Sequence, residues 1–182
     1  MTDEQRAKLF PIILAEYNPE WPQWYFEEKE RLVSLIGAEN ISRIRHIGST
    51  SVPGLVAKPT VDILLETTEK ANIDELVASL PCDEYICLHQ QTIPTFDLVL
   101  ILKGYTSTGF AKRVYHIHVR QPGDWDEILF RDYLHAHPNV ADAYAILKRE
   151  LKDLFEHDRD AYTNAKGEFI KNVIKQARNA DL

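Results

Sequence analysis

Apolar and polar positions along the chain predict one helix, then a group of strands, then a helical C-terminal part. From Trp24 to Ile36 the apolar side chains leave a separate charged face of glutamate, lysine and arginine. This pattern predicts a helix that ends at Gly37. Residues 41–47 then alternate apolar with polar side chains, as a half-buried strand does.

Four further strands are predicted, over residues 60–66, 85–89, 96–102 and 113–120, with a short edge strand over residues 12–14. The run at 96–102 is too apolar for the edge of a sheet. Within 113–120, the period of two places His116, His118 and Arg120 on one face. A short helix is predicted over residues 72–80, where Pro81 ends it.

The chain is predicted to be helical from residue 124 onward. Asp124, with Glu127 three residues later, resembles a capping box. Apolar positions at helical spacing predict three C-terminal helices, over residues 125–137, 140–155 and 160–178. This order of elements predicts an α+β protein whose mixed β-sheet is flanked by helices. We assign residues 1–182 to a single domain, with an α/β core at 1–123 and a helical part at 124–182.

The composition is that of a soluble globular protein, since 45% of the 182 residues are hydrophobic and 27% are charged. No apolar run reaches the roughly 18 residues of a membrane helix, and the first residues lack the features of a signal peptide. The formal net charge of −7 argues against a general nucleic-acid binder, which needs a broad basic face. Without a long apolar run we expect no membrane partner. Cys82 and Cys87 form no metal-binding or disulfide pattern, so we expect free thiols and a cytoplasmic location.

A loop of small residues joins the strands predicted at 41–47 and 60–66. It offers backbone N–H groups and hydroxyls with little bulk, which suits contact with phosphate oxygens; its residues are Gly48, Ser49, Thr50 and Ser51. The loop is not a P-loop, because Gly48 is not followed by Gly-Lys-Ser/Thr at the required spacing. Asp62, at the head of the second strand, would place a negative charge where a cation could bind. The alternative is an ordinary Gly/Pro-rich connection.

The Gly48-Ser49 pair after one strand, with Asp62 at the head of the next, resembles the signature of the nucleotidyltransferase (polymerase beta-like) superfamily. The longer string HIGSTSVPGLVAKPTVDI, residues 46–63, resembles the GrpB family, a branch of that superfamily. Further matches cover nearly the whole chain: YNP at 17–19, WP at 21–22, HV at 118–119, FRDYL at 130–134, YAILK at 144–148 and DAYTNAKGEFI at 160–170. The resemblance implies a nucleotidyltransferase-like sheet followed by three C-terminal helices.

The resemblance also implies a divalent-metal site. Active members of the superfamily hold two Mg²⁺ ions with two acids spaced two apart on the second strand and a third acid on a neighbouring strand. Here Leu64 occupies the second acidic position, and Glu66 lies roughly 13 Å from Asp62 along the strand, too far to share an ion. Asp97, at the head of a strand, could supply a further carboxylate. The two-metal site is therefore incomplete in this chain.

Two histidines on the strand at 113–120 are further candidates. His116 and His118 share a face, and imidazoles in that arrangement can bind a metal or act as acid and base. Packing is the alternative role for either histidine. His118 belongs to the matched family motif and His116 does not, so we expect His118 to join Asp62 as a catalytic residue and as a ligand of one Mg²⁺ or Mn²⁺.

Basic side chains in the matched segments could neutralise an anionic ligand. We expect Lys58 and Arg131 to do so, the arginine through bidentate contacts, and Lys166 is a further candidate. For Arg131, Lys148 and Lys166, the alternative is a surface position on a helix, in an ion pair or in solvent.

These residues favour a nucleotidyltransferase-fold protein that binds a nucleotide or another phosphorylated small molecule. The loop at 48–51 would hold the phosphates, and Asp62 and His118 would serve metal-dependent nucleotidyl or phosphoryl transfer. The alternative is a catalytically degenerate module that binds a ligand or a protein, which Leu64 supports.

Overall fold

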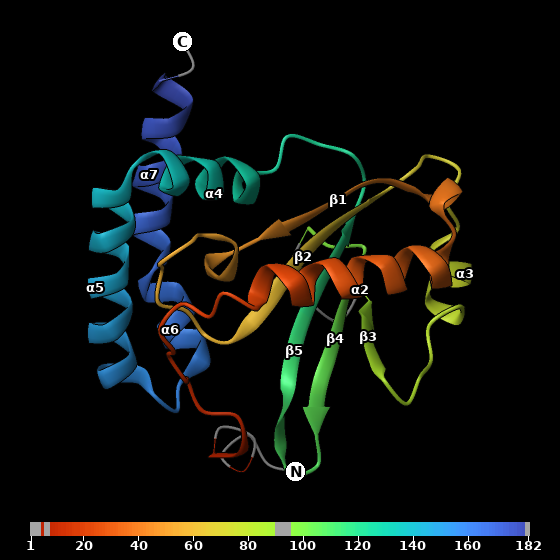
Figure 1. Cartoon of the computed structure of the whole chain (residues 1–182), viewed down its shortest axis with the longest axis horizontal. Coiled ribbons are helices and arrows are strands. Elements are labelled where there is room, and N and C mark those ends of the chain that lie inside the picture. The colour runs from red at the N-terminus through yellow and green to blue at the C-terminus, as the bar shows by residue number, and fades with distance from the viewer. Residues whose placement is uncertain (1–4, 6–7, 90–95, 181–182) are drawn as a thin grey trace.

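A computed structural model of the chain describes residues 5, 8–89 and 96–180. Its centre is a five-stranded mixed sheet in the order β1-β2-β5-β4-β3 (Figure 1). Strands β2 and β5 pair in parallel, and the other neighbours pair antiparallel. The predicted α+β class with a mixed sheet is confirmed. The strands are β1 (Ile41–Ile47), β2 (Thr60–Thr67), β3 (Tyr85–His89), β4 (Val99–Thr106) and β5 (Gly109–Arg120).

Helix α2 (Trp21–Ile36) crosses one face of the sheet, and the short helix α3 (Ile73–Ala78) follows β2 (Figure 1). Alternate residues of the central strands pack against α2 because strand side chains project to opposite faces. Leu32 of α2 is fully buried there. The strand residues in this core cluster include Val61, Ile63, Leu65, Val99, Ile101, Tyr115, Ile117 and Val119.

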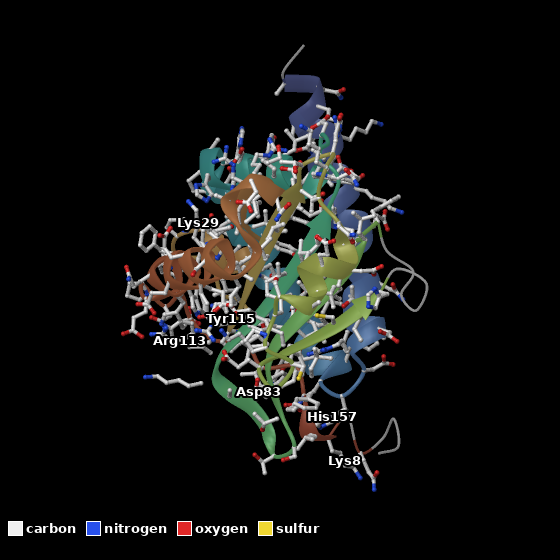
Figure 2. All side chains as sticks on the ribbon, turned by 90° about the vertical axis from the view of Figure 1, so that its right-hand side faces the viewer. Lys8, Lys29, Asp83, Arg113, Tyr115 and His157 are labelled. Atoms are coloured by element: carbon white, nitrogen blue, oxygen red, sulfur yellow. The ribbon has the colours of Figure 1, made fainter. Side chains whose placement is uncertain are left out.

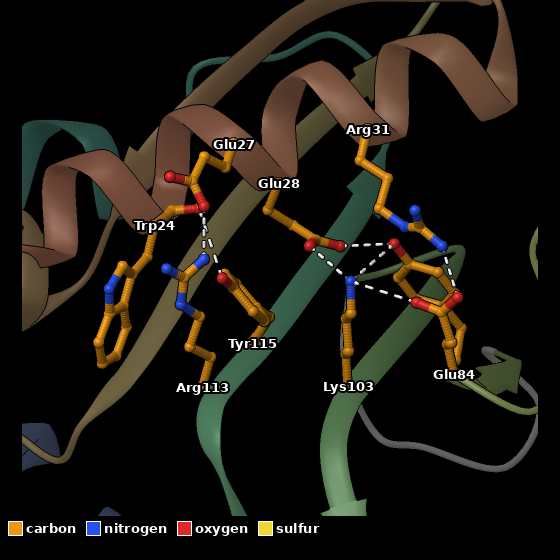
Figure 3. A network of polar contacts seen from close by, with 9 residues as sticks. Trp24, Glu27, Glu28, Arg31, Glu84, Lys103, Arg113 and Tyr115 are labelled. Atoms are coloured by element: carbon orange, nitrogen blue, oxygen red, sulfur yellow. Dashed lines mark hydrogen bonds and ion pairs between the residues drawn. The ribbon is translucent and has the colours of Figure 1, made fainter.

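A polar network fastens α2 to the sheet (Figure 3). The carboxylate of Glu28, only 4% exposed, accepts a hydrogen bond from the Tyr85 hydroxyl at 2.6 Å and from the Lys103 ammonium at 2.7 Å. Beside it, exposed Arg31 pairs with Glu84 at 2.5 Å. The buried carboxylate thus has a cation and a hydroxyl as partners, as burial of a charge requires.

The opposite face of β2 and β5 carries polar side chains. In the parallel register, Asp62 lies beside His116, and Leu64 lies beside His118. Glu66 and Arg120 form the next pair along the strands. The predicted grouping of His116, His118 and Arg120 on one face is therefore confirmed, and Asp62 shares that face.

Four helices follow the sheet and lie beside its β1–β2 side (Figure 1). They are α4 (Asp126–Ala136), α5 (Pro138–Phe155), α6 (Arg159–Ala165) and α7 (Gly167–Ala180). The prediction of three helices is wrong, because the helix expected over 160–178 is interrupted at Lys166. Glycine is a poor helix former, and Gly167 follows the interruption directly. Within the described chain, no helix has the length and apolar character needed to cross a membrane.

Several predicted boundaries also differ. Asp124 does not cap α4: the N-cap is Trp125, and Asp124 pairs with Arg178 at 2.8 Å. The edge strand expected over 12–14 is replaced by a single bridge between Ala15 and Ala57. The strand predicted at 96–102 is β4, which begins and ends later.

Strand β4 is interior, as predicted, because it lies between β5 and β3. Its hairpin with β5 is longer than expected. The Thr106 hydroxyl donates a hydrogen bond to the Gly109 carbonyl at 2.8 Å, which closes a tight turn and extends both strands.

Candidate functional site

The loop that follows β1 passes directly over the carboxylate of Asp62. Gly48 has φ +72° and begins the 3₁₀ turn η2 (Ser49–Ser51). A β-carbon at Gly48 would stand 2.5 Å from Oδ2 of Asp62, closer than any real contact. Glycine therefore permits both the backbone angle and the close approach. The structure brings the predicted loop and the predicted carboxylate together.

Two of the loop hydroxyls stabilise the loop itself. Ser51 Oγ donates to the Gly48 carbonyl at 2.5 Å, and Thr50 Oγ1 donates to the Thr60 carbonyl at 3.1 Å. Thr50 is 1% exposed. The hydroxyls of Thr50 and Ser51 thus donate to backbone carbonyls, whereas the Ser49 hydroxyl accepts a hydrogen bond from a lysine.

Lys148, on α5, extends its ammonium group to the loop. The Nζ atom donates to Ser49 Oγ at 2.9 Å and also to the Val56 carbonyl. It lies 4.5 Å from the centre of the Tyr144 ring. Only 2% of Lys148 is exposed, so the interpretation as a surface lysine is wrong. Burial, reinforced by the charge of Lys166, lowers the pKa of Lys148 to about 7.

Two further lysines share one aromatic ring next to this site. Lys166 and Lys58 place their Nζ atoms 4.3 Å and 5.8 Å from the centre of the Tyr162 ring. Tyr162 is fully buried. Burial, with the charge of Lys58, lowers the pKa of Lys166 to about 7, and burial also lowers the pKa of Lys58. The interruption between α6 and α7 positions Lys166 here.

The three lysines outnumber the acids around them. Among the described residues, Asp62 is the carboxylate that acts on Lys58 and Lys166, and every charge that shifts the pKa of Lys148 is a cation. Clustered, poorly hydrated cations repel one another and are costly without an anion. We define these three lysines, Lys58, Lys148 and Lys166, as the lysine cluster.

On its other side, Asp62 contacts β5. His116 Nδ1 lies 3.4 Å from Asp62 Oδ1, and His116 Nε2 lies 2.7 Å from the Tyr105 hydroxyl. Burial raises the pKa of Asp62, but the nearby His116, His118 and Lys58 outweigh it and leave that pKa below its usual value. Burial lowers the pKa of His116. Asp62 is thus an ionised carboxylate, with 29% of its side chain exposed.

His118 is held by a buried ion pair. Its Nδ1 atom lies 2.8 Å from Asp97 Oδ2, and Arg120 Nε donates to Asp97 Oδ1 at 2.5 Å. Asp97 is 1% exposed. Burial lowers the pKa of His118, but the Asp97 carboxylate raises it more. Asp97 thus fixes the orientation of the His118 ring, and in this arrangement Nε2 is the nitrogen free of the Asp97 contact.

Two residues considered at the sequence level have other partners. Arg131 donates from Nη1 to the His46 carbonyl at 2.8 Å and from Nε to Asp132 at 2.7 Å. The arginine therefore joins α4 to the end of β1. Glu66, as expected, is separate from Asp62: it accepts from Arg43 and from the Gly123 backbone N–H at 2.9 Å.

The described residues include no group of three or more His, Cys, Asp and Glu side chains arranged to hold a metal ion. Asp62 and His118 could supply two ligands. Mg²⁺ is commonly bound by one or two carboxylates together with substrate phosphates. The residues present therefore fit a cation bound jointly with a phosphorylated ligand, and they do not fit a complete protein-only site.

The site adds two residues that sequence reasoning did not select, Lys148 and His116. Lys148 had a detectable signal, because Tyr144 four residues before it and Leu151 three residues after it both lie on the buried side of α5. A lysine within an apolar helix stripe is a candidate for a buried cation. For His116, the contact with Asp62 depends on the β2–β5 pairing, which the local pattern does not reveal.

Fold and site together define an α+β protein with a buried lysine cluster beside a carboxylate and two histidines at one face of its sheet. The family model described as "GrpB protein" matches residues 11–176. The chain belongs to the GrpB family.

Relatives with similar sequences agree with this assignment. The chain is 34% identical over 165 residues to the UPF0157 protein YqkA of Bacillus subtilis, with 89% of this chain and 46% of that protein covered. It is 31% identical over 173 residues to the glutamate-rich protein GrpB of Alkalihalophilus pseudofirmus, with 91% and 95% covered. The chain thus spans about half of the first relative and nearly all of the second.

A third relative has a different name. The chain is 29% identical over 188 residues to a dephospho-CoA kinase of Mycolicibacterium paratuberculosis, covering 92% of this chain and 46% of that protein. Among solved structures, GrpB from Enterococcus faecalis is 33% identical, with a TM-score of 0.76 over 91% of this chain and 96% of that one. A chain of the GLD-2/RNP-8 complex shares the fold at a TM-score of 0.52 with 11% identity, over 90% of this chain and 54% of that one.

Proposed function

We propose that this GrpB protein binds a nucleotide or another phosphorylated small molecule. The observation that carries the proposal is the hydrogen bond from the almost fully buried Lys148 to Ser49 in the loop beside Asp62. Lys58 and Lys166 add two further cations, and the charge of Asp62 acts on both. A phosphate group would supply the negative charge that the cluster lacks. Gly48 and Ser49 would contact its oxygens through backbone N–H groups and the serine hydroxyl.

The proposed fold is that of a nucleotidyltransferase. Its support is the order of the parts: a Gly48-Ser49 pair after β1, then Asp62 on β2, with β5 alongside in parallel. The structural likeness to a chain of the GLD-2/RNP-8 complex supports a fold wider than the GrpB family.

The proposed reaction is nucleotidyl or phosphoryl transfer. One Mg²⁺ or Mn²⁺, held by Asp62, His118 and the ligand's phosphates, would supply charge stabilisation at the transferred phosphoryl group. Asp97 would hold the His118 ring in position. The lysine cluster would stabilise the charge that builds on the phosphate oxygens and the leaving group. Arg131 would act indirectly: its hydrogen bond to the His46 carbonyl would hold the backbone that leads into the loop.

A second candidate is a binding module without catalysis. The observation that favours it is Leu64, which is fully buried where the superfamily pattern has an acid. The name of the mycobacterial relative, dephospho-CoA kinase, supports a nucleotide-containing ligand under either proposal.

Binding would be tested by calorimetry with Mg²⁺, tripolyphosphate and ATP, each alone and in combination. Wild type should bind Mg²⁺ with ATP, and Asp62→Asn should abolish the contribution of Mg²⁺. Lys148→Met should lower the affinity at least about tenfold without unfolding the protein, because it replaces a buried cation with an apolar chain of similar length. The absence of binding to every phosphate compound would overturn the proposal.

Lys152→Met provides a matched control on the same helix. Lys152 is 32% exposed and pairs with Glu156 at 3.4 Å, so its loss should not alter phosphate affinity. Transfer from ATP to water or to an added hydroxyl acceptor, with release of pyrophosphate (nucleotidyl transfer) or ADP (phosphoryl transfer), and its loss in Asp62→Asn, would support the enzyme. Tight Mg²⁺–ATP binding with no turnover on any acceptor would favour the binding module.

A further inference from the structure

A large pocket of about 910 Å³ lies next to the Asp62 site. Three segments form its walls: the N-terminal stretch at 9–12, strands β3 and β4, and the connection between α5 and α6. Figure 2 shows His157 of the α5–α6 connection, and Lys8 directly before the N-terminal stretch, on the side of the sheet away from α2. The pocket therefore lies over the same sheet face as Asp62.

Tyr105 connects the pocket to Asp62. It lines the pocket, and its hydroxyl lies 2.7 Å from His116 Nε2. His116 in turn contacts Asp62. One histidine thus separates the pocket wall from the central carboxylate.

Arg159 connects the pocket to the lysine cluster. Its Nη1 atom donates to the Tyr105 hydroxyl at 3.3 Å, and its charge helps lower the pKa of Lys58. Arg159 lines this pocket and also a smaller one of about 180 Å³ that includes Lys58. A single ligand of nucleotide length could therefore contact the cluster and reach the pocket.

The inner surface of the pocket is mainly apolar and aromatic. Ile86 and Leu102 belong to its sheet wall, and 45% of Ile86 is exposed. Phe10 packs against Tyr105 with ring centres 5.1 Å apart. The α5–α6 connection forms another wall with three carboxylates, one imidazole and one guanidinium, those of Glu156, Asp158, Asp160, His157 and Arg159. Pockets for small molecules typically combine apolar and aromatic walls with a few polar groups that orient the ligand. The carboxylates here could accept hydrogen bonds from the amino group of a base.

We propose that this pocket binds the base of a nucleoside polyphosphate whose phosphates contact the lysine cluster. The inference rests on the proposed function and narrows it, because it separates nucleotides from sugar phosphates and inorganic polyphosphates. Stacking and burial of the base would add affinity that a bare polyphosphate lacks. The base would lie over the sheet wall formed by β3 and β4.

Calorimetry with ATP and with tripolyphosphate, both with Mg²⁺, tests this inference. Wild type should bind ATP at least about tenfold more tightly than tripolyphosphate. Ile86→Ser should remove most of that difference and leave the tripolyphosphate affinity unchanged. Ile146→Ser is the matched control, because Ile146 is 57% exposed on α5 and does not line the pocket. It should change neither affinity.

Isoleucine-methyl NMR supplies a direct readout. The Ile86 δ1 methyl signal should move on addition of ATP and stay in place with tripolyphosphate, since only an aromatic base produces a ring-current shift. Equal affinities of wild type for the two ligands, or an unmoved Ile86 signal with bound ATP, would overturn the base pocket alone. Failure of both ligands to bind would overturn the phosphate site and the base pocket together.

Discussion

Gly48 lies so close to Asp62 that a β-carbon on the glycine would stand 2.5 Å from the carboxylate. Gly54, farther along the same loop, has a similar φ of +79° but no atom within 4 Å of the equivalent position. Both glycines have a positive φ, which an L side chain would strain, but only Gly48 approaches the carboxylate. Comparing alanine substitutions at the two positions therefore distinguishes the effect of backbone strain from the effect of displacing Asp62.

Gly48→Ala and Gly54→Ala should each lower the free energy of unfolding by about 1–3 kcal/mol, because an L side chain is strained at positive φ. Only Gly48→Ala should also displace Asp62 and weaken Mg²⁺–ATP binding, by at least about tenfold. Urea unfolding and calorimetry measure the two effects. Equal loss of binding in both variants would show that contact with Asp62 is not the cause.

The Glu28 network predicts a stability effect distant from the site. In Glu28→Gln, the Lys103 ammonium loses its nearest carboxylate and retains Glu84 at 3.6 Å. Lys103 is 19% exposed, so water compensates in part. We expect the free energy of unfolding to fall by about 2 kcal/mol, less than for a fully buried pair. Urea denaturation measures this change.

Glu27→Gln is the control for that variant. Glu27 lies on the same helix and pairs with Arg113 at 2.5 Å, but both side chains are more than 40% exposed. Its substitution should leave stability unchanged within error. A similar loss in the two variants would assign the effect to helix charge and not to the buried network.

Local pattern was enough to predict most of the sheet and the shared face of His116, His118 and Arg120. The period of two determines which side chains share a face once the strands are known. Local pattern does not predict which strands pair with one another in the sheet. His116 contacts Asp62 because β2 pairs with β5, which are separated by two other strands in sequence.

The helical part was less predictable for the same reason. The spacing of apolar residues indicates that Lys148 faces inward, but its bond to Ser49 joins residues 99 positions apart. The apolar period also continues across Lys166, so it did not reveal the interruption that separates α6 from α7. The positions of Lys148 and Lys166 in the site therefore depend on tertiary packing, which local periodicity does not encode.

The buried pair of Asp97 and His118 predicts a shift in a histidine pKa. Because the Asp97 carboxylate is the main group that raises the pKa of His118 against the effect of burial, Asp97→Asn should lower that pKa. NMR titration of the His118 ring measures it. An unchanged pKa would show that Asp97 does not control the proton on His118.

The same pair contributes stability in a defined pH range. The raised pKa of His118 stabilises the fold below pH 6.5, and this contribution is lost as the pH rises through the folded value. The lowered pKa of Asp97 stabilises the fold above its usual 3.8 and is lost on acidification. Asp97→Asn should therefore lower the free energy of unfolding most, by about 3 kcal/mol, between about pH 3.8 and pH 6.5. His118→Gln should flatten the upper limb of that profile.

The lysine cluster predicts that ligand binding takes up protons. Lys148 and Lys166 have pKa values of about 7 in the folded protein and 10.5 as their usual value. Between about pH 7 and pH 10.5 the unfolded chain binds more protons at these lysines than the folded protein does, so the free energy of unfolding rises with pH. A bound phosphate favours the ammonium forms and raises both pKa values. Affinity for Mg²⁺–ATP should therefore fall as the pH rises from about 6 to 8.

Calorimetry at about pH 7.5 in two buffers of different ionisation enthalpy measures the protons directly. With pKa values of about 7, roughly three quarters of Lys148 and of Lys166 are neutral at this pH. Wild type should therefore take up at most about 1.5 protons on binding Mg²⁺–ATP. Lys148→Met should reduce the uptake by up to about one proton, whereas Lys152→Met should leave it unchanged. Equal binding enthalpies in the two buffers would mean that both lysines are already charged, and the low pKa values would be contradicted.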